Sequence, residues 1–420
     1  WKVPIDGAKP TPINFSATPE VALGPQLSSR YPISHSATFT VKQIRDPAVS
    51  PDGSKIVFSS LDRLYIADLP NGTPRRVTTQ DVGEFQPAWS PDGSSIAYVT
   101  WDDASGEGYL MRARIAAAPQ APVRVIPQSA FFQLPAFSPD GRRIVPTRAS
   151  ARDLREAIDP FIGDGIGAEF VWAPALGGSA NVIGPVANRW RPHFVANDTS
   201  RIYMYGFVPP RGTPGTPTFV PGSLALLSVR WDNTDMKTHL NVTHRVPVLA
   251  GGREMSRTSD IILPKDFSKD TSREPSTIPT FQADLILKAP RGDYALAQVG
   301  NEFYVVTVPT IGGGRAPSVL VTKPDSAAVP VRKLSDVGGE FPSWSANGRA
   351  VHWSIGNAFF TYNIDSARAN PDYRPSESRF RLAVTRDIPQ GTVVLRGAGV
   401  LTMRTNNEVN ENADVVIRNN

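Results

Sequence analysis

Short apolar stretches with the character of β-strands recur along the chain, and each begins just after a turn. Residues 55–58 read Lys-Ile-Val-Phe and residues 95–99 read Ser-Ile-Ala-Tyr-Val, rich in the β-branched and aromatic residues that strands favour. Residues 143–145 and 350–353 repeat this character. Helical periodicity occurs only near residues 150–158. The pattern therefore predicts an all-β fold.

A four-residue turn stands just before each of these runs. Ser-Pro-Asp-Gly occurs at residues 50–53, 90–93 and 138–141, and a degenerate Ser-Ala-Asn-Gly occurs at residues 345–348. Proline presets φ, aspartate bonds its own backbone and glycine accepts a positive φ, so each copy suits a connection between two antiparallel strands. The structural turn residues predicted in this way are Asp52, Gly53, Asp92, Gly93, Asp140 and Gly141.

A large aromatic residue stands one position before the serine of three turns. These residues are Trp89, Phe137 and Trp344. Their equal place in the repeat predicts that they pack between neighbouring units. A strand–turn–strand unit that recurs every ~40–60 residues is typical of a β-propeller, which we favour over a generic β-sandwich.

The repeats predict six blades over residues 38–370, after an extended arm at 1–37 and before a separate segment at 371–420. The run at 39–44 alternates like a strand, and we expect it to pair with the last blade and close the ring. The predicted blades start near residues 46, 85, 131, 190, 283 and 338. Long polar interruptions, which we expect to lie outside the core, occur at 151–168, 208–222 and 251–280.

Composition narrows the class of function. The chain has 44 Lys and Arg against 39 Asp and Glu, a net charge of +5, and the basic residues are scattered, which argues against nucleic-acid binding. Cysteine is absent, so disulfides and thiol chemistry are excluded. No apolar run approaches the ~18 residues that span a membrane. We expect a secreted or periplasmic protein from which a segment before Trp1 has been removed.

The last fifty residues differ from the repeats. Strand-like segments occur at 380–384, 392–403, 406–409 and 412–417, with no partner domain in the sequence. A few strands do not form a stable unit alone. We therefore expect the chain to end inside a domain, as the first strands of an incomplete β-sandwich.

These last strands also carry a family resemblance. Residues 392–403 and 411–417 resemble the opening of metal-dependent amidohydrolases, where such strands begin a small β-sandwich beside a barrel of alternating strands and helices. The Pro-Asp-Gly turns, with Val-Gly-Gly-Glu-Phe-Pro-Ser-Trp-Ser at 337–345, resemble the TolB-like, PD40-type propeller that precedes the barrel in one branch of that superfamily. The resemblance covers roughly residues 40–420 and implies a six-bladed TolB-like β-propeller followed by a partial β-sandwich.

The resemblance implies an enzyme that hydrolyses amide-type C–N bonds of a peptide-like or small amide substrate, with zinc or a similar divalent metal in the barrel. The first metal ligands of that superfamily form a His-x-His pair, and none of the five histidines here has that spacing. This chain is therefore expected to hold no catalytic residue and no metal ligand, and to be inactive alone. We expect a partner chain that carries the barrel, cut from one precursor near Asn420, and an oligomeric assembly in which the propeller controls access or assembly.

Few residues of this chain suggest chemistry of their own. Arg191 and His193, on the predicted inner strand of the fourth blade, are candidates for lining the central channel. His239 and His244 fall on opposite faces of a strand, so joint metal binding is not expected. The sequence has neither a Gly-x-Ser-x-Gly elbow nor a His-Glu-x-x-His motif. Two alternatives stay open: a stand-alone TolB-like exported binding propeller, and the accessory propeller of a serine peptidase.

Overall fold

The computed structural model divides the chain into two units. One unit, Thr40–Val384, contains the repeats, and the other combines Trp1–Phe39 with Thr385–Asn420. The structure describes residues 2–6, 9, 11, 12, 14, 16, 34, 36–156, 166–208, 223–245, 280–309, 316–324, 327–370, 372–387, 391–402 and 408–418. The predicted interruptions at 208–222 and 251–280, apart from their end residues Val208 and Thr280, and most of the predicted arm at 1–37 lie outside these residues.

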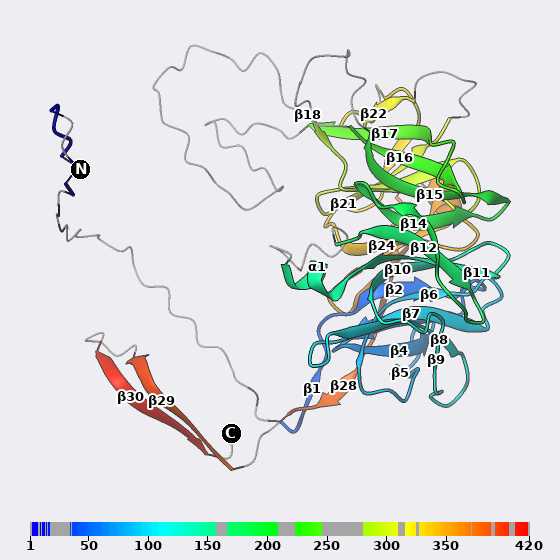
Figure 1. The fold of residues 1–420 in the computed structure, drawn as a ribbon. Coiled ribbons are helices and arrows are strands. Elements are labelled where there is room, and N and C mark those ends of the chain that lie inside the picture. Colours follow the sequence, from blue (N-terminus) through cyan, green and yellow to red (C-terminus); the bar gives the residue numbers. More distant parts are fainter. Residues whose placement is uncertain are drawn as a thin grey trace. The chain divides into compact units, whose positions relative to one another are not determined.

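Five of the blades are four-stranded sheets whose strands pair in chain order (Figure 1). Blade one contains β2 (Arg45–Val49), β3 (Lys55–Ser60), β4 (Arg63–Asp68) and β5 (Arg75–Arg76). Blade two contains β6 (Gly83–Trp89), β7 (Ser95–Asp102), β8 (Glu107–Arg114) and β9 (Val123–Arg124). Blade three contains β10 (Phe131–Phe137), β11 (Arg143–Ala149), β12 (Glu169–Pro174) and β13 (Asn181–Pro185). Blade five contains β19 (Leu285–Lys288), β20 (Tyr294–Val299), β21 (Glu302–Thr307) and β23 (Val331–Lys333). Blade six contains β24 (Glu340–Trp344), β25 (Ala350–Ile355), β26 (Ala358–Asn363) and β27 (Ser376–Arg379).

Blade four is a larger sheet than the others. Its strands are β14 (Arg189–Val195), β15 (Asp198–Val208), β16 (Ser223–Arg230), β17 (Lys237–Arg245) and β18 (Thr280–Gln282). A further strand, β22 (Ser318–Leu320), lies between β21 and β23 along the chain but pairs in parallel with β17 of blade four. Blade five thus contributes a strand to its neighbour.

The six sheets form a closed ring. The first strand of each blade is its inner strand, and contacts run from β2 to β6, from β6 to β10, from β10 to β14 and from β14 to β19. Blade six contacts blade five through β20 and β24, and it contacts blade one through β24 and β2. The prediction of an all-β, six-bladed propeller is therefore confirmed.

The run predicted to close the ring does contact the end of the propeller. The N–H of Val41 donates to the carbonyl of Leu382 at 2.8 Å, and the N–H of Ile44 donates to the carbonyl of Gly356 at 2.9 Å. Its strand β1 (Thr38–Thr40) does not extend the sheet of blade six but pairs with β28 (Ala383–Thr385) in a separate two-stranded sheet. This run consequently adds a few backbone hydrogen bonds beside blade six to the contacts between β24 and β2 that close the ring.

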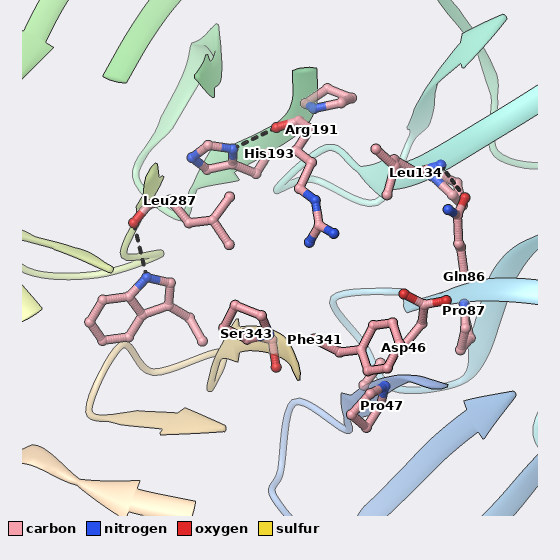
Figure 2. Close-up of a pocket in the computed structure, with 15 residues that line it drawn as sticks. Asp46, Pro47, Gln86, Pro87, Leu134, Arg191, His193, Leu287, Phe341 and Ser343 are labelled. Carbon is pink, nitrogen blue, oxygen red and sulfur yellow. Dashed lines mark hydrogen bonds between the residues drawn. The ribbon is translucent and has the colours of Figure 1, made fainter. Parts of the chain in front are cut away.

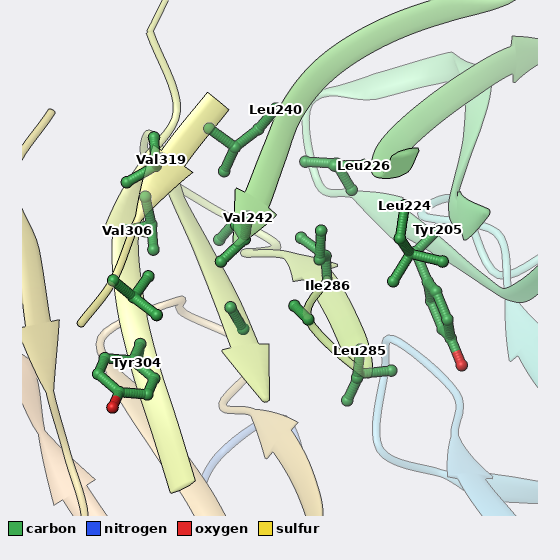
Figure 3. Close-up of a cluster of buried hydrophobic side chains, with 14 of the residues drawn as sticks. Tyr205, Leu224, Leu226, Leu240, Val242, Leu285, Ile286, Tyr304, Val306 and Val319 are labelled. Atoms are coloured by element: carbon green, nitrogen blue, oxygen red, sulfur yellow. The ribbon is translucent and has the colours of Figure 1, made fainter. Parts of the chain in front are cut away.

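Apolar side chains fill the spaces between adjacent blades. Because strands buried on both faces need apolar residues at successive positions, their sequences read as nearly continuous apolar runs. Figure 3 shows the cluster between blades four and five, where Leu226 and Val242 gather with Ile286 and Val306. All four are fully buried. Burying an aliphatic side chain of this size stabilises the fold by about 1.5–3 kcal/mol, so these clusters hold the ring together.

The described residues include two short helices. The first, α1 (Ala151–Glu156), lies within the helix predicted at 150–158. The second, α2 (Ile364–Ala369), was not predicted, and Asn363 caps it by accepting a hydrogen bond from the N–H of Ser366 at 2.9 Å. Neither helix in the described part of the chain is long and apolar enough to cross a lipid bilayer.

The end of the propeller lies further along the chain than the predicted boundary at residue 370. The strand β27 belongs to the segment assigned to the linker, but it pairs with β26 as the fourth strand of blade six. The helix α2 lies in the connection between these two strands. The sequence of blade six therefore lacks a short turn at this point.

The second unit contains an antiparallel hairpin of β29 (Thr392–Leu401) and β30 (Val409–Arg418). The prediction of separate strands at 406–409 and 412–417 is wrong in this respect, since β30 runs without a break through both described parts. Residues 403–407 lie outside the described residues. Among the described residues of the arm, an antiparallel bridge joins Lys2 to Thr11.

Candidate ligand-binding channel

The predicted turn residues occupy the same place in blades one, two and three. The glycines Gly53, Gly93 and Gly141 have φ values of 76°, 71° and 70°, in the left-handed region that glycine adopts without a steric penalty. Each aspartate accepts hydrogen bonds from the hydroxyl of the preceding serine and from the N–H two residues later. These bonds favour the carboxylate, so they lower the pKa of Asp52 and Asp92 to about 2 and also lower the pKa of Asp140.

The three aromatic residues that precede the turns lie between blades. The indole N–H of Trp89 donates to the carbonyl of Ala48 in blade one at 2.9 Å. The indole N–H of Trp344 makes the equivalent bond to the carbonyl of Leu287 in blade five at 3.1 Å. Phe137 has no such donor, and it is buried in an apolar cluster that joins blades two and three. The same position in the repeat therefore connects neighbouring blades in two ways.

Five inner strands contain a strained residue that precedes a proline, and in three of them it stands three residues before the aromatic residue just described. The strained residues and their φ values are Asp46 (47°), Gln86 (52°), Leu134 (50°), Arg191 (53°) and Phe341 (54°). The strand register shifts at each of them, as at a β-bulge. A non-glycine residue in this conformation costs ~1–3 kcal/mol and persists where its surroundings enforce it. Five blades thus share a bulge that redirects one side chain.

These bulges surround a cavity of about 270 Å³ (Figure 2). Its wall contains residues from the inner strand of every blade, namely β2, β6, β10, β14, β19 and β24. The two residues predicted to line the channel, Arg191 and His193, both belong to this wall. A concave site with several convergent polar groups is where a small ligand binds most often, so this channel is the candidate site.

His193 is held in one tautomer by the backbone. Its Nε2 accepts a hydrogen bond from the N–H of Lys288 in blade five at 2.9 Å, so its Nδ1 carries the proton and donates to the carbonyl of Arg191 at 2.8 Å. Removal of the ring from bulk water, together with the nearby charges of Lys288 and Arg191, lowers its pKa to about 4. His193 is therefore neutral at pH 7, and both its nitrogens are occupied.

Asp46 and Arg191 are the charged side chains that point into the channel in Figure 2. They come from blade one and blade four, which lie on opposite sides of a ring of six. Gln86 also belongs to the wall, and its Oε1 accepts a hydrogen bond from the N–H of Leu134 at 2.7 Å. The hydroxyl of Ser343 is buried in the wall without a hydrogen-bond partner among the described residues.

The other described histidines do not converge on one point. His239 Nε2 lies 2.7 Å from Ser228 Oγ, and His352 Nδ1 lies 3.0 Å from Thr361 Oγ1. Burial lowers the pKa of both to about 4, and it also lowers the pKa of His244. Within the described residues, no group of three or more His, Asp and Glu is arranged to hold a metal ion. The described part of this chain therefore does not fit the divalent metal that the amidohydrolase resemblance implies.

Comparisons with known proteins give partial matches. No protein-family model matches the chain. The uncharacterized peptidase YuxL of Bacillus subtilis is 32% identical over 143 residues, which is 25% of this chain and 22% of that protein. This chain therefore covers less than two thirds of that relative.

Several solved structures are similar to this chain at low sequence identity. TolB from Acinetobacter baumannii has a TM-score of 0.42 and 15% identity, covering 81% of this chain and 65% of its own. An oligogalacturonate lyase in complex with manganese has a TM-score of 0.44 and 14% identity, covering 82% and 78%. The tricorn protease has a TM-score of 0.41 and 10% identity, covering 83% and 36%.

Sequence analysis missed most of the channel wall. It named Arg191 and His193, but it treated Asp46, Gln86 and Phe341 only as parts of blades. The signal was available, because each of these residues precedes the proline that stands before a turn. A proline repeated at one position of an inner strand indicates a bulge, since proline cannot donate to the strand ladder.

Proposed function

We propose that this chain is the non-catalytic propeller part of a metal-dependent amidohydrolase that hydrolyses amide-type C–N bonds. The observation that carries the proposal is the surface of the hairpin β29–β30. Large apolar side chains are exposed there on adjacent positions: Val393 is 50% exposed, Val394 42% and Leu395 53%. Adjacent residues of a strand point to opposite faces, so both faces of the hairpin are apolar and exposed.

Such a hairpin needs more protein around it. The facing strand repeats the pattern, with Val416 51% exposed and Ile417 44% exposed. A two-stranded hairpin is at best marginally stable alone, and exposed apolar faces with open edges favour pairing with further strands. Further strands and a catalytic barrel, as the amidohydrolase resemblance implies, would cover these side chains and supply the metal site.

The propeller's role in this proposal is to handle the substrate outside the catalytic centre. Its channel is lined by side chains from every blade, and His193 is neutral and bonded through both ring nitrogens. Such a group does not act as a general base, because neither nitrogen is available to take a proton. The channel therefore suits selection or passage of a small molecule. A secreted or periplasmic location is part of the same proposal.

One observation favours a second candidate, the accessory propeller of a serine peptidase. The stretch shared with YuxL is 32% identical, and that protein is named as a peptidase. The same propeller would then stand beside a serine nucleophile in another part of the polypeptide. A metal-dependent hydrolase and a serine peptidase are inhibited by different compounds, so one experiment distinguishes the two candidates.

The test compares the natural gene product with this 420-residue chain. Both are purified, their intact masses are measured, and release of free amine from N-acyl amino acids and dipeptides is followed with EDTA, with EDTA followed by zinc, and with diisopropyl fluorophosphate. We expect a natural product heavier than 45.5 kDa whose turnover EDTA abolishes and zinc restores, and no turnover by this chain. Inhibition by the fluorophosphate alone would establish the peptidase candidate instead. A natural product of the same mass as this chain, without hydrolytic activity, would overturn both.

A further inference from the structure

The channel wall combines two opposite charges with several apolar side chains. Asp46 and Arg191 extend into the cavity from blades one and four (Figure 2). The wall between them contains Leu134, Leu287 and Phe341. A surface of this kind matches a molecule that carries one positive group, one negative group and an apolar body.

The backbone holds the charged side chains in place at a cost. Asp46 and Arg191 both have a positive φ, and both precede a proline. A following proline restricts a residue to extended conformations, so a positive φ at these two positions is strained. Strained residues of this kind gather at ligand clamps, where the surrounding fold enforces them. In the propeller the strain recurs at one position of five inner strands and surrounds a single cavity.

A buried polar group in the same wall has no hydrogen-bond partner within the described part of the chain. Ser343 stands at the position that His193 occupies in blade four, and its hydroxyl has no hydrogen-bond partner among the described residues. A buried hydroxyl without a partner is unusual in a folded protein. A ligand in the channel would place polar atoms near it.

We propose that the central channel binds a small zwitterion with an apolar side chain, such as an α-amino acid or a short peptide. Arg191 pairs with its carboxylate, Asp46 pairs with its ammonium group, and Leu134, Leu287 and Phe341 contact its side chain. The planar guanidinium suits a carboxylate because two N–H groups can bond its two oxygens. The inference goes beyond the proposed hydrolase function and does not depend on it, because binding is measured on this chain without turnover.

The size of the cavity limits the ligand. Pockets for drug-sized molecules have volumes of about 300–1,000 Å³, and this cavity has about 270 Å³. A single amino acid or a dipeptide is of a suitable size, whereas a longer peptide would have to extend along the channel axis.

The first experiment varies the ligand and leaves the chain unchanged. Isothermal titration calorimetry of the 420-residue chain is carried out with L-leucine and with L-leucyl-L-leucine. N-acetyl-L-leucine, which lacks the ammonium group, and L-leucinamide, which lacks the carboxylate, serve as matched probes. We expect saturable binding of at least one zwitterion and about tenfold or greater weakening for each probe, because a charge-assisted hydrogen bond is lost in each case.

The second experiment varies the wall. Arg191→Gln and Asp46→Asn each keep the approximate shape of the side chain and remove its charge, and each should weaken binding of the same zwitterion about tenfold or more. Arg142→Gln is the matched control, because it removes a positive charge from an exposed turn outside the channel wall. It should leave the affinity unchanged. Circular dichroism of each variant verifies the fold.

Several results would overturn the proposal. They are the absence of saturable binding for both zwitterions, equal binding of N-acetyl-L-leucine and L-leucine, and unchanged affinity in folded Arg191→Gln and Asp46→Asn variants. If either variant fails to fold, the comparison of the four ligands on the unchanged chain still decides. A channel that binds no zwitterion in a natural product with metal-dependent turnover would reject this inference and leave the proposed function standing.

Discussion

Blade four and blade five are neighbours in the ring, yet each has a different one of the two features of the repeat. These features are the strained bulge of the inner strand and the glycine turn that follows it. Blade four has the strained residue Arg191 and its proline, but Val195 pairs directly with Asp198, with no Pro-Asp-Gly turn between β14 and β15. Blade five has a Pro-Arg-Gly form of the turn, with Gly292 at a φ of 78°. Its inner strand β19, all of which is described, pairs with β20 in unbroken register and has no bulge.

This difference separates the tasks of the two motifs. The turn closes a hairpin, and it works in blade five without any bulge. The bulge shapes the channel, and it works in blade four without the turn. Blade four accordingly presents Arg191 and His193 to the cavity, whereas blade five presents only Leu287. A hydrogen bond from the N–H of Lys288 in blade five to Nε2 of His193 in blade four connects the inner strands of the two blades.

The largest effect should come from the residue between the two motifs. In blade three this residue is Phe137, which is 8% exposed, and truncating Phe137→Ala should cost about 3–5 kcal/mol of unfolding free energy through the cavity it leaves. In blade four it is Phe194, which is half-buried and stacked on Trp231 at 5.7 Å. Phe194→Ala should cost about 1–2 kcal/mol. Denaturant unfolding of both variants measures the difference, and equal losses would contradict the distinction between the blades.

A smaller loss should follow from removing the link between blades four and five. His193→Leu leaves the carbonyl of Arg191 and the N–H of Lys288 without their partner. Each unpaired buried group costs ~1–3 kcal/mol, and access of channel water to this wall reduces the sum, so we expect about 2 kcal/mol. The matched control is Ser343→Ala at the same repeat position, which removes a hydroxyl that has no hydrogen-bond partner among the described residues and should change stability by less than about 0.5 kcal/mol. Urea denaturation tests both, and a control as destabilising as the histidine variant would refute the assigned role.

The fold was predictable because its signals are local. The Ser-Pro-Asp-Gly turns and the apolar runs after them fix hairpins within a few residues, and hairpins repeated at regular spacing predict the ring. Blade six was cut short at residue 370 because α2 interrupts it, and a six-residue helix with one polar cap gives little periodicity. The strand exchange by β22 depends on contacts far apart in the sequence, so no local pattern indicates it.

The channel was less predictable for the opposite reason. Its side chains come from six strands, and only ring closure brings Asp46 near Arg191. The proline after each strained residue was visible, but a proline alone does not state whether the preceding side chain points into a channel or into the space between blades. His193 was identified beside Arg191, whereas its bond to Lys288 requires knowledge of which blade follows which.

The smallest effect should distinguish two glycines of the same turn. Gly53 in blade one has a φ of 76°, and a Cβ added there would meet nothing within 4 Å. Gly53→Ala should therefore lower the unfolding free energy only through the conformational penalty of the left-handed region. The net loss should be ~1 kcal/mol, because alanine also reduces the conformational entropy of the unfolded chain. Gly348 in blade six has a similar φ of 69°, but its Cβ would collide with the backbone of Arg291 in the turn of blade five. Because that backbone must move, Gly348→Ala should cost about 2 kcal/mol. Thermal and urea unfolding of the two variants measure this difference of about 1 kcal/mol, and equal stabilities would show that the turns of blades five and six do not pack against each other.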